Sequence, residues 1–407
     1  WGDGSREAAV SHAHIAPVGH SCQVTTTANP IDPHPPTAEV AALTVQASQE
    51  SMTRGQLTSV DICEGLLMRI AAIDAPDSQV ALRAVLAVSP TVLEEARASD
   101  RDRAAGIVRG ALHGIPVLVK DNIEASGLPA CAGSQALLAT FPALGGEPAA
   151  ASGRLWVIDP PGNLVLSYSA AAPDQALLGL PVAGDAVLVT RLREAGAIVL
   201  GSTNLSEWAN FRSRRSTSGW SAVGGLTGNP WSLDRSAGGS SSGSGAAVAG
   251  GLAPLAVGTE TNGSITSPAS LNGVVGLKAT VGSIPTRGIV PLSPSQDAPG
   301  PLTRCIVDAA IAFEVLSGTR GAVDACAPGT SSAVRVGVAT GWLTGDAATD
   351  DAFHDAVDLL AGHVGSVVRV EAATPTFQVL EDQVCVLLAE FDDALGEAFL
   401  PHRNSER

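Results

Sequence analysis

Two serines in this sequence stand at positions where their hydroxyl groups could work together in acyl transfer. Ser240 lies in the glycine- and serine-rich run Gly238–Gly245, and Ser264 closes an Asn-Gly-Ser tripeptide 24 positions later. The residues between them, Ala246–Gly258, are uncharged and mostly apolar, which predicts a short buried helix followed by a buried strand. A chain that leaves one loop, crosses the core and returns to a second loop can bring the two hydroxyls together.

The run Gly238–Gly245 has two interpretations. Glycine- and serine-rich stretches are usually flexible linkers. This run leads directly into apolar residues that need burial, which favours an ordered loop whose backbone N–H groups face a ligand. A phosphate loop would need the pattern GxxxxGK[ST], and no lysine follows here, so a developing oxyanion is the ligand that remains. Its composition predicts neither regular helix nor strand for the run itself.

The lysines are the next candidates for chemistry. Of the 24 lysines and arginines only Lys120 and Lys278 are lysines, which leaves 22 arginines. Arginine stays protonated, whereas a buried lysine can be neutral and act as a base. Lys120 closes the apolar stretch within Leu112–Asn122, which reads as a buried strand with the lysine at its carboxyl end, where functional residues of α/β proteins gather. The alternative is that Lys120 only extends its amine to solvent.

The residues around Ser264 suit the stabilisation of an oxyanion. The sequence GSITSPA can begin a helix, so the backbone amides of Asn262, Gly263 and Ser264 can point at one oxygen atom. Each such donor lowers the barrier of acyl transfer by about 3–4 kcal/mol.

Composition limits the other classes of function. The 407 residues are 45% hydrophobic and 16% charged, which allows a large core. The formal net charge of −16 and the lack of a basic run do not favour a nucleic-acid partner.

The six cysteines show no CxxC spacing and no HExxH occurs, so no metal site is expected. No apolar run reaches 18 residues, so no membrane span is expected. The chain begins at Trp1 rather than Met, so its compartment cannot be read.

Helical and strand patterns alternate along the chain, which favours an α/β fold. Residues 1–37 are expected to form an irregular arm, Arg212–Gly239 a polar loop, and Ala139–Leu180 an inserted surface excursion. The expected regular elements are a helical region over Ala38–Asp74, a helix over Val88–Asp102, a helix–turn–strand unit over Asp185–Gly201, a helix over Asp308–Leu316, a strand over Val334–Val338, and helices over Asp350–Gly362 and Gln378–Phe399.

Several blocks of this sequence together resemble the amidase signature family. They are GGSSSGSGAAVAGG…GTETNGSITSPAS, LHGIPVLVKDNI, GAIVLGSTNLSEWANFRS and NGVVGLKATVGSIPTRGIVPLSPSQDAPGPLTR. The resemblance covers roughly Ala38 to Leu316, apart from the excursion. It implies one large α/β domain over residues 38–407, with a mixed central β-sheet covered by helices on both faces. Within the family the sequence is most similar to the peptide amidases, which deamidate C-terminal peptide amides.

The family's catalytic roles carry over to matching positions. The resemblance implies Ser264 as nucleophile, Ser240 as bridging serine after a cis peptide bond at Gly239–Ser240, and Lys120 as base. It also implies oxyanion donors at Thr261, Asn262, Gly263 and Ser264, and supporting roles for Ser241 and Thr259. Lys120 would have to be neutral, so its pKa must fall well below the usual value of about 10.4. The mechanism needs no cofactor and no metal, and the expected partner is a small-molecule or peptide amide.

Three features depart from the family pattern. Thr266 stands where relatives that handle carboxylates have arginine, which argues against recognition of a substrate carboxylate. The excursion Ala139–Leu180 has no counterpart in the compact members. The chain stops at Arg407, short of the family's usual C-terminal part. Lys278 matches a family block but follows the nucleophile, so a structural role is expected for it.

Three other readings stay open. The residues Gly239–Gly243 fit the GxSxG pattern of Ser-His-Asp hydrolases, with Ser241 as nucleophile and His354, His363 or His402 as partner, but that motif needs a strand directly before it. The A subunit of a tRNA-dependent amidotransferase would share the serines and the lysine. A noncatalytic binding protein could use the same scaffold. An SxxK arrangement is excluded, because neither lysine has a serine three residues before it.

Overall fold

The computed structural model describes residues 38–135, 184–213, 215–339, 341, 343–371 and 377–399. The expected arm over residues 1–37 and the expected excursion Ala139–Leu180 lie outside these residues.

The helices are α1 (Ala38–Ala41), α2 (Val45–Thr53), α3 (Ser59–Arg69), α4 (Val92–Ala104), α6 (Val187–Glu194), α7 (Ser242–Ala249), α8 (Thr266–Asn272), α9 (Ile306–Ser317), α10 (Ala322–Ala325), α11 (Ala347–Ala361) and α12 (Phe377–Phe399). Shorter helical turns span Ile70–Asp74, Glu207–Asn210 and Thr330–Ala333. The strands are β1 (Val85–Val88), β2 (Pro116–Lys120), β3 (Ile198–Thr203), β4 (Trp220–Ser221), β5 (Gly225–Leu226), β6 (Leu255–Glu260), β7 (Val275–Gly276), β8 (Ala298–Thr303), β9 (Arg335–Ala339) and β10 (Ser366–Val370).

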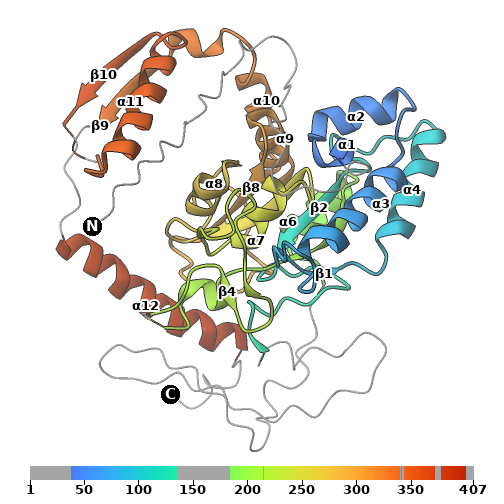
Figure 1. Cartoon of the computed structure of the whole chain (residues 1–407), viewed down its shortest axis with the longest axis horizontal. Helices are drawn as coiled ribbons and strands as arrows, with labels where there is room; N and C mark the ends of the chain where they lie inside the picture. Colours follow the sequence, from blue (N-terminus) through green and yellow to red (C-terminus); the bar gives the residue numbers. More distant parts are fainter. Residues whose placement is uncertain are drawn as a thin grey trace, which may run out of the picture.

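A six-stranded mixed sheet forms the centre of the molecule, in the order β1-β3-β2-β6-β8-β7. Strand β2 is parallel to β3 and to β6, whereas β1, β8 and β7 join antiparallel. Helices pack on both faces of this sheet (Figure 1), so the expected α/β architecture is confirmed. Because β3, β2 and β6 are parallel neighbours, their carboxyl ends meet at one edge, the place where α/β proteins usually bind ligands.

Helix α7 corrects the expectation for the glycine- and serine-rich run. It begins at Ser242, inside the stretch whose composition predicts no regular structure. The hydroxyl of Ser244 lies 2.8 Å from Thr203 Oγ1, and that of Ser242 lies 3.2 Å from Thr227 Oγ1. These serines bond to neighbouring segments and not to the turns of their own backbone, so they do not compete with the helix. Tertiary packing therefore decides the structure of this run.

Two strands lie where the sequence suggested something else. Val88 was expected to begin a helix, but Val85–Val88 is strand β1 and the helix begins only at Val92. A short apolar run cannot be assigned to helix or strand by periodicity alone. Strand β8 lies in a stretch that is rich in Gly, Pro and Ser, and it holds Pro299 and Pro301. Pro301 O accepts a hydrogen bond from Leu277 N on the β7 side. Because the nitrogen and the carbonyl oxygen of a strand residue point to the same side, the proline nitrogens face away from β6 and from the hydrogen bonds between β6 and β8.

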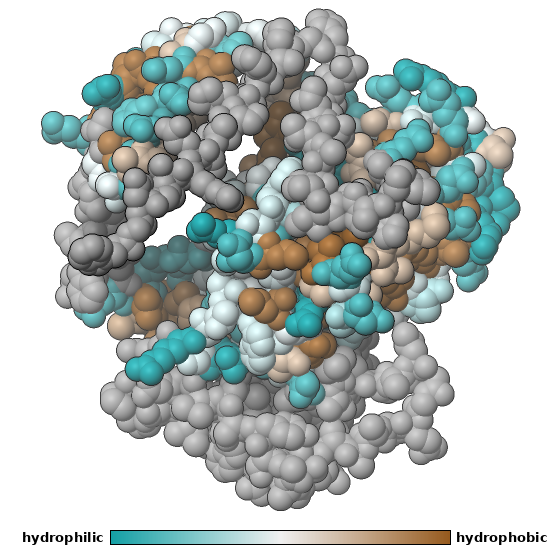
Figure 2. Space-filling view, viewed as in Figure 1, coloured by the Kyte–Doolittle hydropathy of each residue, from teal (hydrophilic) through white to brown (hydrophobic). Residues whose placement is uncertain are grey.

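The end of the described chain forms a small unit and a returning helix. Strands β9 and β10 pair in parallel, with α11 between them in sequence, and β10 was not expected from the sequence. Apolar side chains lie on the surface of this unit (Figure 2), among them Phe353, Leu359 and Val368. Helix α12 packs against the main body through Leu387 and Phe391, which join a cluster with Cys131, Ala132, Trp208 and Leu292.

We predict that Gly243→Ala destabilises the fold. An added Cβ would lie 2.3 Å from Ala84 O and 2.6 Å from the backbone of Asn204, and such overpacking costs about 1–3 kcal/mol. Gly362→Ala is the matched control, because its Cβ would meet only Leu359 O, at 3.5 Å. Urea unfolding of both variants measures the difference. Equal stability of Gly243→Ala and wild type would show that α7 does not pack as closely as described.

Candidate active site

Lys120 lies at the carboxyl end of β2 with its amine inside the protein. All five residues of the strand are buried, and the lysine side chain is fully buried. Its Nζ lies 2.7 Å from Ser240 Oγ, 2.8 Å from Thr259 Oγ1 and 3.3 Å from Thr259 O. The amine therefore does not reach solvent, and the structure rules out the solvent-facing alternative for this residue.

The environment of Lys120 favours the neutral amine. Burial lowers the pKa of Lys120 to about 7, from an ordinary value of 10.5, because the charged ammonium loses its hydration. The carboxylates of Asp297 and Glu260 act in the opposite direction and raise this pKa. A large fraction of Lys120 is thus neutral near pH 7, as a proton acceptor must be.

The loop before α7 brings Ser240 and Ser241 to this amine. The peptide bond Gly239–Ser240 is cis, as expected. Ser240 is buried, and its carbonyl accepts from Ser206 N at 3.0 Å. Ser241 Oγ donates to Thr259 O at 3.0 Å and accepts from Thr259 N at 3.2 Å. The predicted supporting residues Ser241 and Thr259 therefore hold this loop against the end of β6.

Ser264 lies close by, but its hydroxyl is not bonded to the other candidates. Its backbone carbonyl accepts from Ser241 N at 3.0 Å, and 8% of the residue is exposed. No hydrogen bond joins the hydroxyls of Ser264 and Ser240, both of which the structure describes. The structure therefore brings Lys120, Ser240, Ser241 and Thr259 into one hydrogen-bonded group, and connects Ser264 to that group only through its backbone.

The loop from Thr261 to Ser264 carries a row of free donors. Within the described part of the chain, the backbone N–H groups of these four residues donate no hydrogen bond. Gly263 has a φ of +80° and nothing within 4 Å of the place of a Cβ. A run of unpaired amides in a turn is a site for an anion or an oxyanion, which is the role that the sequence suggests for this loop.

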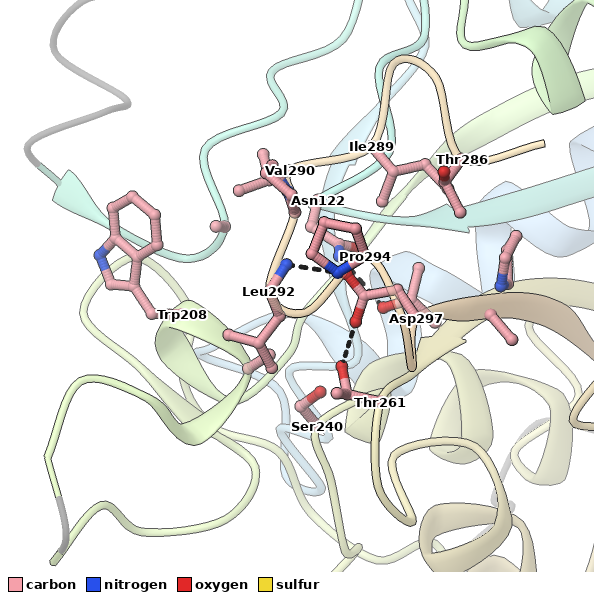
Figure 3. A pocket seen from close by; sticks show the side chains of 16 residues that line it. Asn122, Trp208, Ser240, Thr261, Thr286, Ile289, Val290, Leu292, Pro294 and Asp297 are labelled. Atoms are coloured by element: carbon pink, nitrogen blue, oxygen red, sulfur yellow. Dashed lines mark hydrogen bonds between the residues drawn. The ribbon is translucent and has the colours of Figure 1, made fainter. Parts of the chain in front are cut away.

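A cavity of about 60 Å³ opens beside these groups (Figure 3). The lining residues are Asn122, Ala132, Trp208, Ala209, Ser240, Thr259, Thr261, Thr286, Ile289, Val290, Pro291, Leu292, Pro294, Asp297, Ala298 and Pro299. Most of these described residues are apolar, and Asp297 is the one charged residue among them.

Sequence reasoning missed two acidic residues of the site. Asp297 accepts from the hydroxyl of Thr261 through one oxygen and from two backbone amides of its own loop through the other, and burial raises its pKa above the ordinary value. Glu260 ends β6, is 5% exposed, and accepts from the backbone N–H groups of Ile265 and Thr266. Both residues lie in the sequence blocks that resemble the amidase signature family, but neither their type nor their spacing marked them as functional.

Helix α12 supports the wall of the cavity from outside. Phe391 packs edge-on against Trp208, with ring centroids 6.3 Å apart. Glu390 Oε2 accepts from Ser293 Oγ and Ser295 N, on the loop that carries Leu292 and Pro294. Helix α12 thus packs on the outside of the loop that leads into β8.

The Ser-His-Asp reading does not fit this geometry. Ser241 Oγ bonds to Thr259, and the segment before Ser241 is no strand. His354 and His363 are exposed residues of the unit that contains α11, and His402 lies outside the described residues. No group of three or more His, Cys, Asp or Glu within the described ranges could hold a metal ion. Nor does any described helix combine the length and apolarity that a membrane span requires.

Comparison with known proteins gives matches over most of the chain. The family model described as Amidase matches residues 62–144 and 168–396. A protein from Arthroderma benhamiae named "Putative amidase" is 34% identical over 291 residues, which cover 68% of this chain and 43% of that protein. The A subunit of the glutamyl-tRNA(Gln) amidotransferase from Symbiobacterium thermophilum is 38% identical over 266 residues, or 65% of this chain and 44% of its own length. The chain thus spans less than half the length of these two relatives.

A solved structure matches the fold as well. The native peptide amidase from Stenotrophomonas maltophilia aligns with a TM-score of 0.69 and 39% identity, over 88% of this chain and 68% of that one. The family model, the relatives and this structure agree with the blocks quoted from the sequence. The chain belongs to the amidase signature family.

Proposed function

We propose that this chain is an amidase that hydrolyses a carboxamide C–N bond, with Ser264 as nucleophile, Ser240 as proton relay and Lys120 as base. The observation that carries the proposal is the fully buried amine of Lys120, 2.7 Å from Ser240 Oγ. A buried amine with a pKa of about 7 can accept a proton at neutral pH.

The first step forms a bond between Ser264 Oγ and the carbonyl carbon of the substrate. The Ser264 proton passes to Ser240 Oγ as the Ser240 proton passes to Lys120 Nζ. This relay requires the Ser264 hydroxyl to bond to Ser240 in the substrate complex. Such catalytic hydrogen bonds are often long or absent before substrate binds.

The loop Thr261–Ser264 would stabilise the tetrahedral intermediate. Its free N–H groups are the donors for the carbonyl oxygen as that oxygen becomes negative, and one well-placed donor contributes about 3–4 kcal/mol. The protonated Lys120 then returns its proton through Ser240 to the amide nitrogen. The C–N bond breaks, ammonia or an amine leaves, and Ser264 keeps the acyl group.

Water completes the cycle by the same route. Its oxygen attacks the acyl carbon and its proton passes through Ser240 to Lys120. Lys120 then returns that proton through Ser240 to Ser264 Oγ as the ester bond breaks, and a carboxylic acid is released. The net reaction is amide plus water to acid plus ammonia or amine. Every proton that Lys120 takes up is returned, so the residues are regenerated without a cofactor.

The cavity supports an uncharged amide of the kind that a peptide amidase cleaves. The described residues that line it include no lysine or arginine, and Thr266 offers a hydroxyl that is already bonded to Glu260 at 3.2 Å. A substrate carboxylate would therefore find no cation and would meet Asp297. The 39% identity to a peptide amidase structure supports the same substrate class.

The second candidate is the A subunit of a glutamine-dependent tRNA amidotransferase. Relatives with that name match this chain at 32–38% identity. Such a protein would use the same serines and lysine on glutamine, together with partner chains. Glutamine carries an α-carboxylate, which the anionic lining does not favour.

We predict that Ser264→Ala abolishes ammonia release from a C-terminal peptide amide or a simple aryl amide. The loss should exceed about 10³-fold, because the variant has no nucleophile. Ser270→Ala, an exposed serine of α8, is the matched control and should keep activity. Free glutamine is assayed in parallel. Release from glutamine alone would favour the amidotransferase, and release that survives in Ser264→Ala would refute the assigned nucleophile.

The two lysines should differ sharply in importance. Lys120→Ala and Lys120→Arg should both lose about 10²–10⁴-fold in kcat, because alanine removes the base and arginine stays protonated. Lys278→Ala should lose less than either Lys120 variant. Steady-state kinetics on the same amide compares them, and equal losses at the two positions would contradict the role assigned to Lys120.

The pH dependence of kcat/KM should report Lys120. Below its pKa of about 7 the amine is protonated and cannot accept a proton, so activity should rise as pH increases through about 7. The Asp297 carboxylate raises this pKa, so Asp297→Asn should move the acid limb to lower pH, whatever its effect on the maximal rate. A limb that stays in place or moves to higher pH in Asp297→Asn would contradict this electrostatic coupling.

A further inference from the structure

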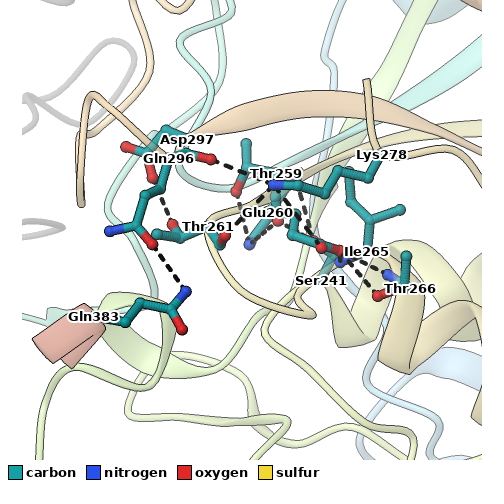
Figure 4. Close-up of polar contacts among 11 residues, drawn as sticks. Ser241, Thr259, Glu260, Thr261, Ile265, Thr266, Lys278, Gln296, Asp297 and Gln383 are labelled. Atoms are coloured by element: carbon teal, nitrogen blue, oxygen red, sulfur yellow. Dashed lines mark hydrogen bonds and ion pairs between the residues drawn. The ribbon is translucent and has the colours of Figure 1, made fainter. Parts of the chain in front are cut away.

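Lys278 is the second of only two lysines in the chain, and the proposed mechanism gives it no part. It follows β7 in sequence, and its side chain is 31% exposed. The amine lies among three oxygen atoms, 3.3 Å from Gln296 O, 3.4 Å from Thr261 O and 4.0 Å from Glu260 Oε1 (Figure 4). Two of these three oxygens belong to Glu260, the last residue of β6, and to Thr261, the first residue of the loop that leads to Ser264.

The contact with Thr261 O bears on the direction of a proposed oxyanion donor. In a planar trans peptide the C=O of one residue and the N–H of the next point in opposite directions. When Lys278 holds the carbonyl of Thr261 on its own side, the N–H of Asn262 must point to the other side. That N–H bonds to no described residue, so its direction is free to serve a ligand.

Glu260 fixes the other end of the same loop. Its Oε2 accepts from Ile265 N at 2.7 Å and Thr266 N at 2.9 Å, the first two amides after Ser264. Its Oε1 faces Lys278. One buried carboxylate therefore connects the amine that holds the start of the loop with the amides that follow its end, and the loop Thr261–Ser264 is held on both sides.

We propose that Lys278 and Glu260 form a positioning pair that aims the backbone amides of the loop Thr261–Ser264 at the oxyanion of the substrate. The inference rests on the proposed amidase function, and neither residue touches the substrate. Lysine suits the task because its ammonium is a compact charge with three donors that can face three separate oxygens. Arginine, used at 22 other positions, presents a planar fork that fits a single carboxylate.

The first test compares Lys278→Met, which keeps length and removes charge, with Arg54→Met, a control at an exposed ion pair. Lys278→Met should lower kcat by roughly 10- to 100-fold. This is no more than the loss expected when one oxyanion donor is removed completely. KM should change less than about threefold. Affinity for a peptide aldehyde, which forms a tetrahedral adduct with a serine, should fall by the same factor as kcat/KM. Arg54→Met should change none of these values.

Chemical rescue of Lys278→Ala and a double variant with Glu260→Gln distinguish a positioning role of Lys278 from a role in packing alone. Propylammonium in solution should restore part of the activity of Lys278→Ala but not of Lys278→Met, whose side chain fills the space. Glu260→Gln should also lower kcat, and the double variant Glu260→Gln/Lys278→Met should be little worse than the more impaired single variant, because the two residues act together. Unchanged kcat in Lys278→Met, losses confined to thermal stability, or additive losses in the double variant would each overturn the inference.

A crystal structure of Lys278→Met keeps this test independent of the proposed function. The Thr261–Asn262 peptide should turn or shift relative to wild type. If the wild-type chain cleaves no amide, the proposed function fails, and the crystal structures alone decide the positioning role. A loop unchanged in Lys278→Met would refute that role whether or not the chain is active.

Discussion

The burial of one amine at the end of β2 is the constraint on which the rest of the site depends. A charged ammonium without water costs several kcal/mol, whereas a neutral amine with hydrogen-bond partners costs much less. Lys120 has three such contacts, to Ser240 and Thr259, and its side chain has no exposed surface. The protein thus keeps the lysine close to neutrality, which is the state in which it can take a proton from a serine.

The topology of the sheet places the partners of this amine. Because β2 and β6 are parallel neighbours, the end of β6 brings Thr259 beside Lys120 and leads directly into the loop Thr261–Ser264. Helix α7 packs against both strands, so the loop before it delivers Ser240 to the same edge. The antiparallel strand β8 pairs Ala298 with Glu260 and sets Asp297 next to the loop. Three loops from distant parts of the sequence therefore meet at one edge of one sheet.

Charge around the amine is balanced between burial and carboxylates. Desolvation lowers the pKa of Lys120, whereas Asp297 and Glu260 raise it. Both carboxylates also accept backbone amides near the site, so each has a structural and an electrostatic effect. These two effects of Asp297 account for an acidic residue in a cavity whose described lining is mostly apolar.

The sequence pointed to candidate site residues more directly than to the framework around them. Lys120 stood out because lysine is so rare here and because it ends an apolar run, and the buried helix and strand expected between Ser240 and Ser264 are present as α7 and β6. The start of α7 at Ser242 and the strand through Pro299 and Pro301 were not predicted, since packing against distant segments overrides local propensity there. Glu260 and Asp297 gave no local signal, because their importance arises only from contacts across the fold.

Direct titration of Lys120 tests the central claim most sharply. With ¹³C label at lysine Cε the chain gives only two signals, because it has only two lysines, and Lys278→Arg assigns them. The account predicts that the Lys120 signal titrates near pH 7. A Lys120 signal that titrates near 10.4, the value of an unperturbed lysine, would contradict a neutral catalytic amine and with it the proposed proton relay.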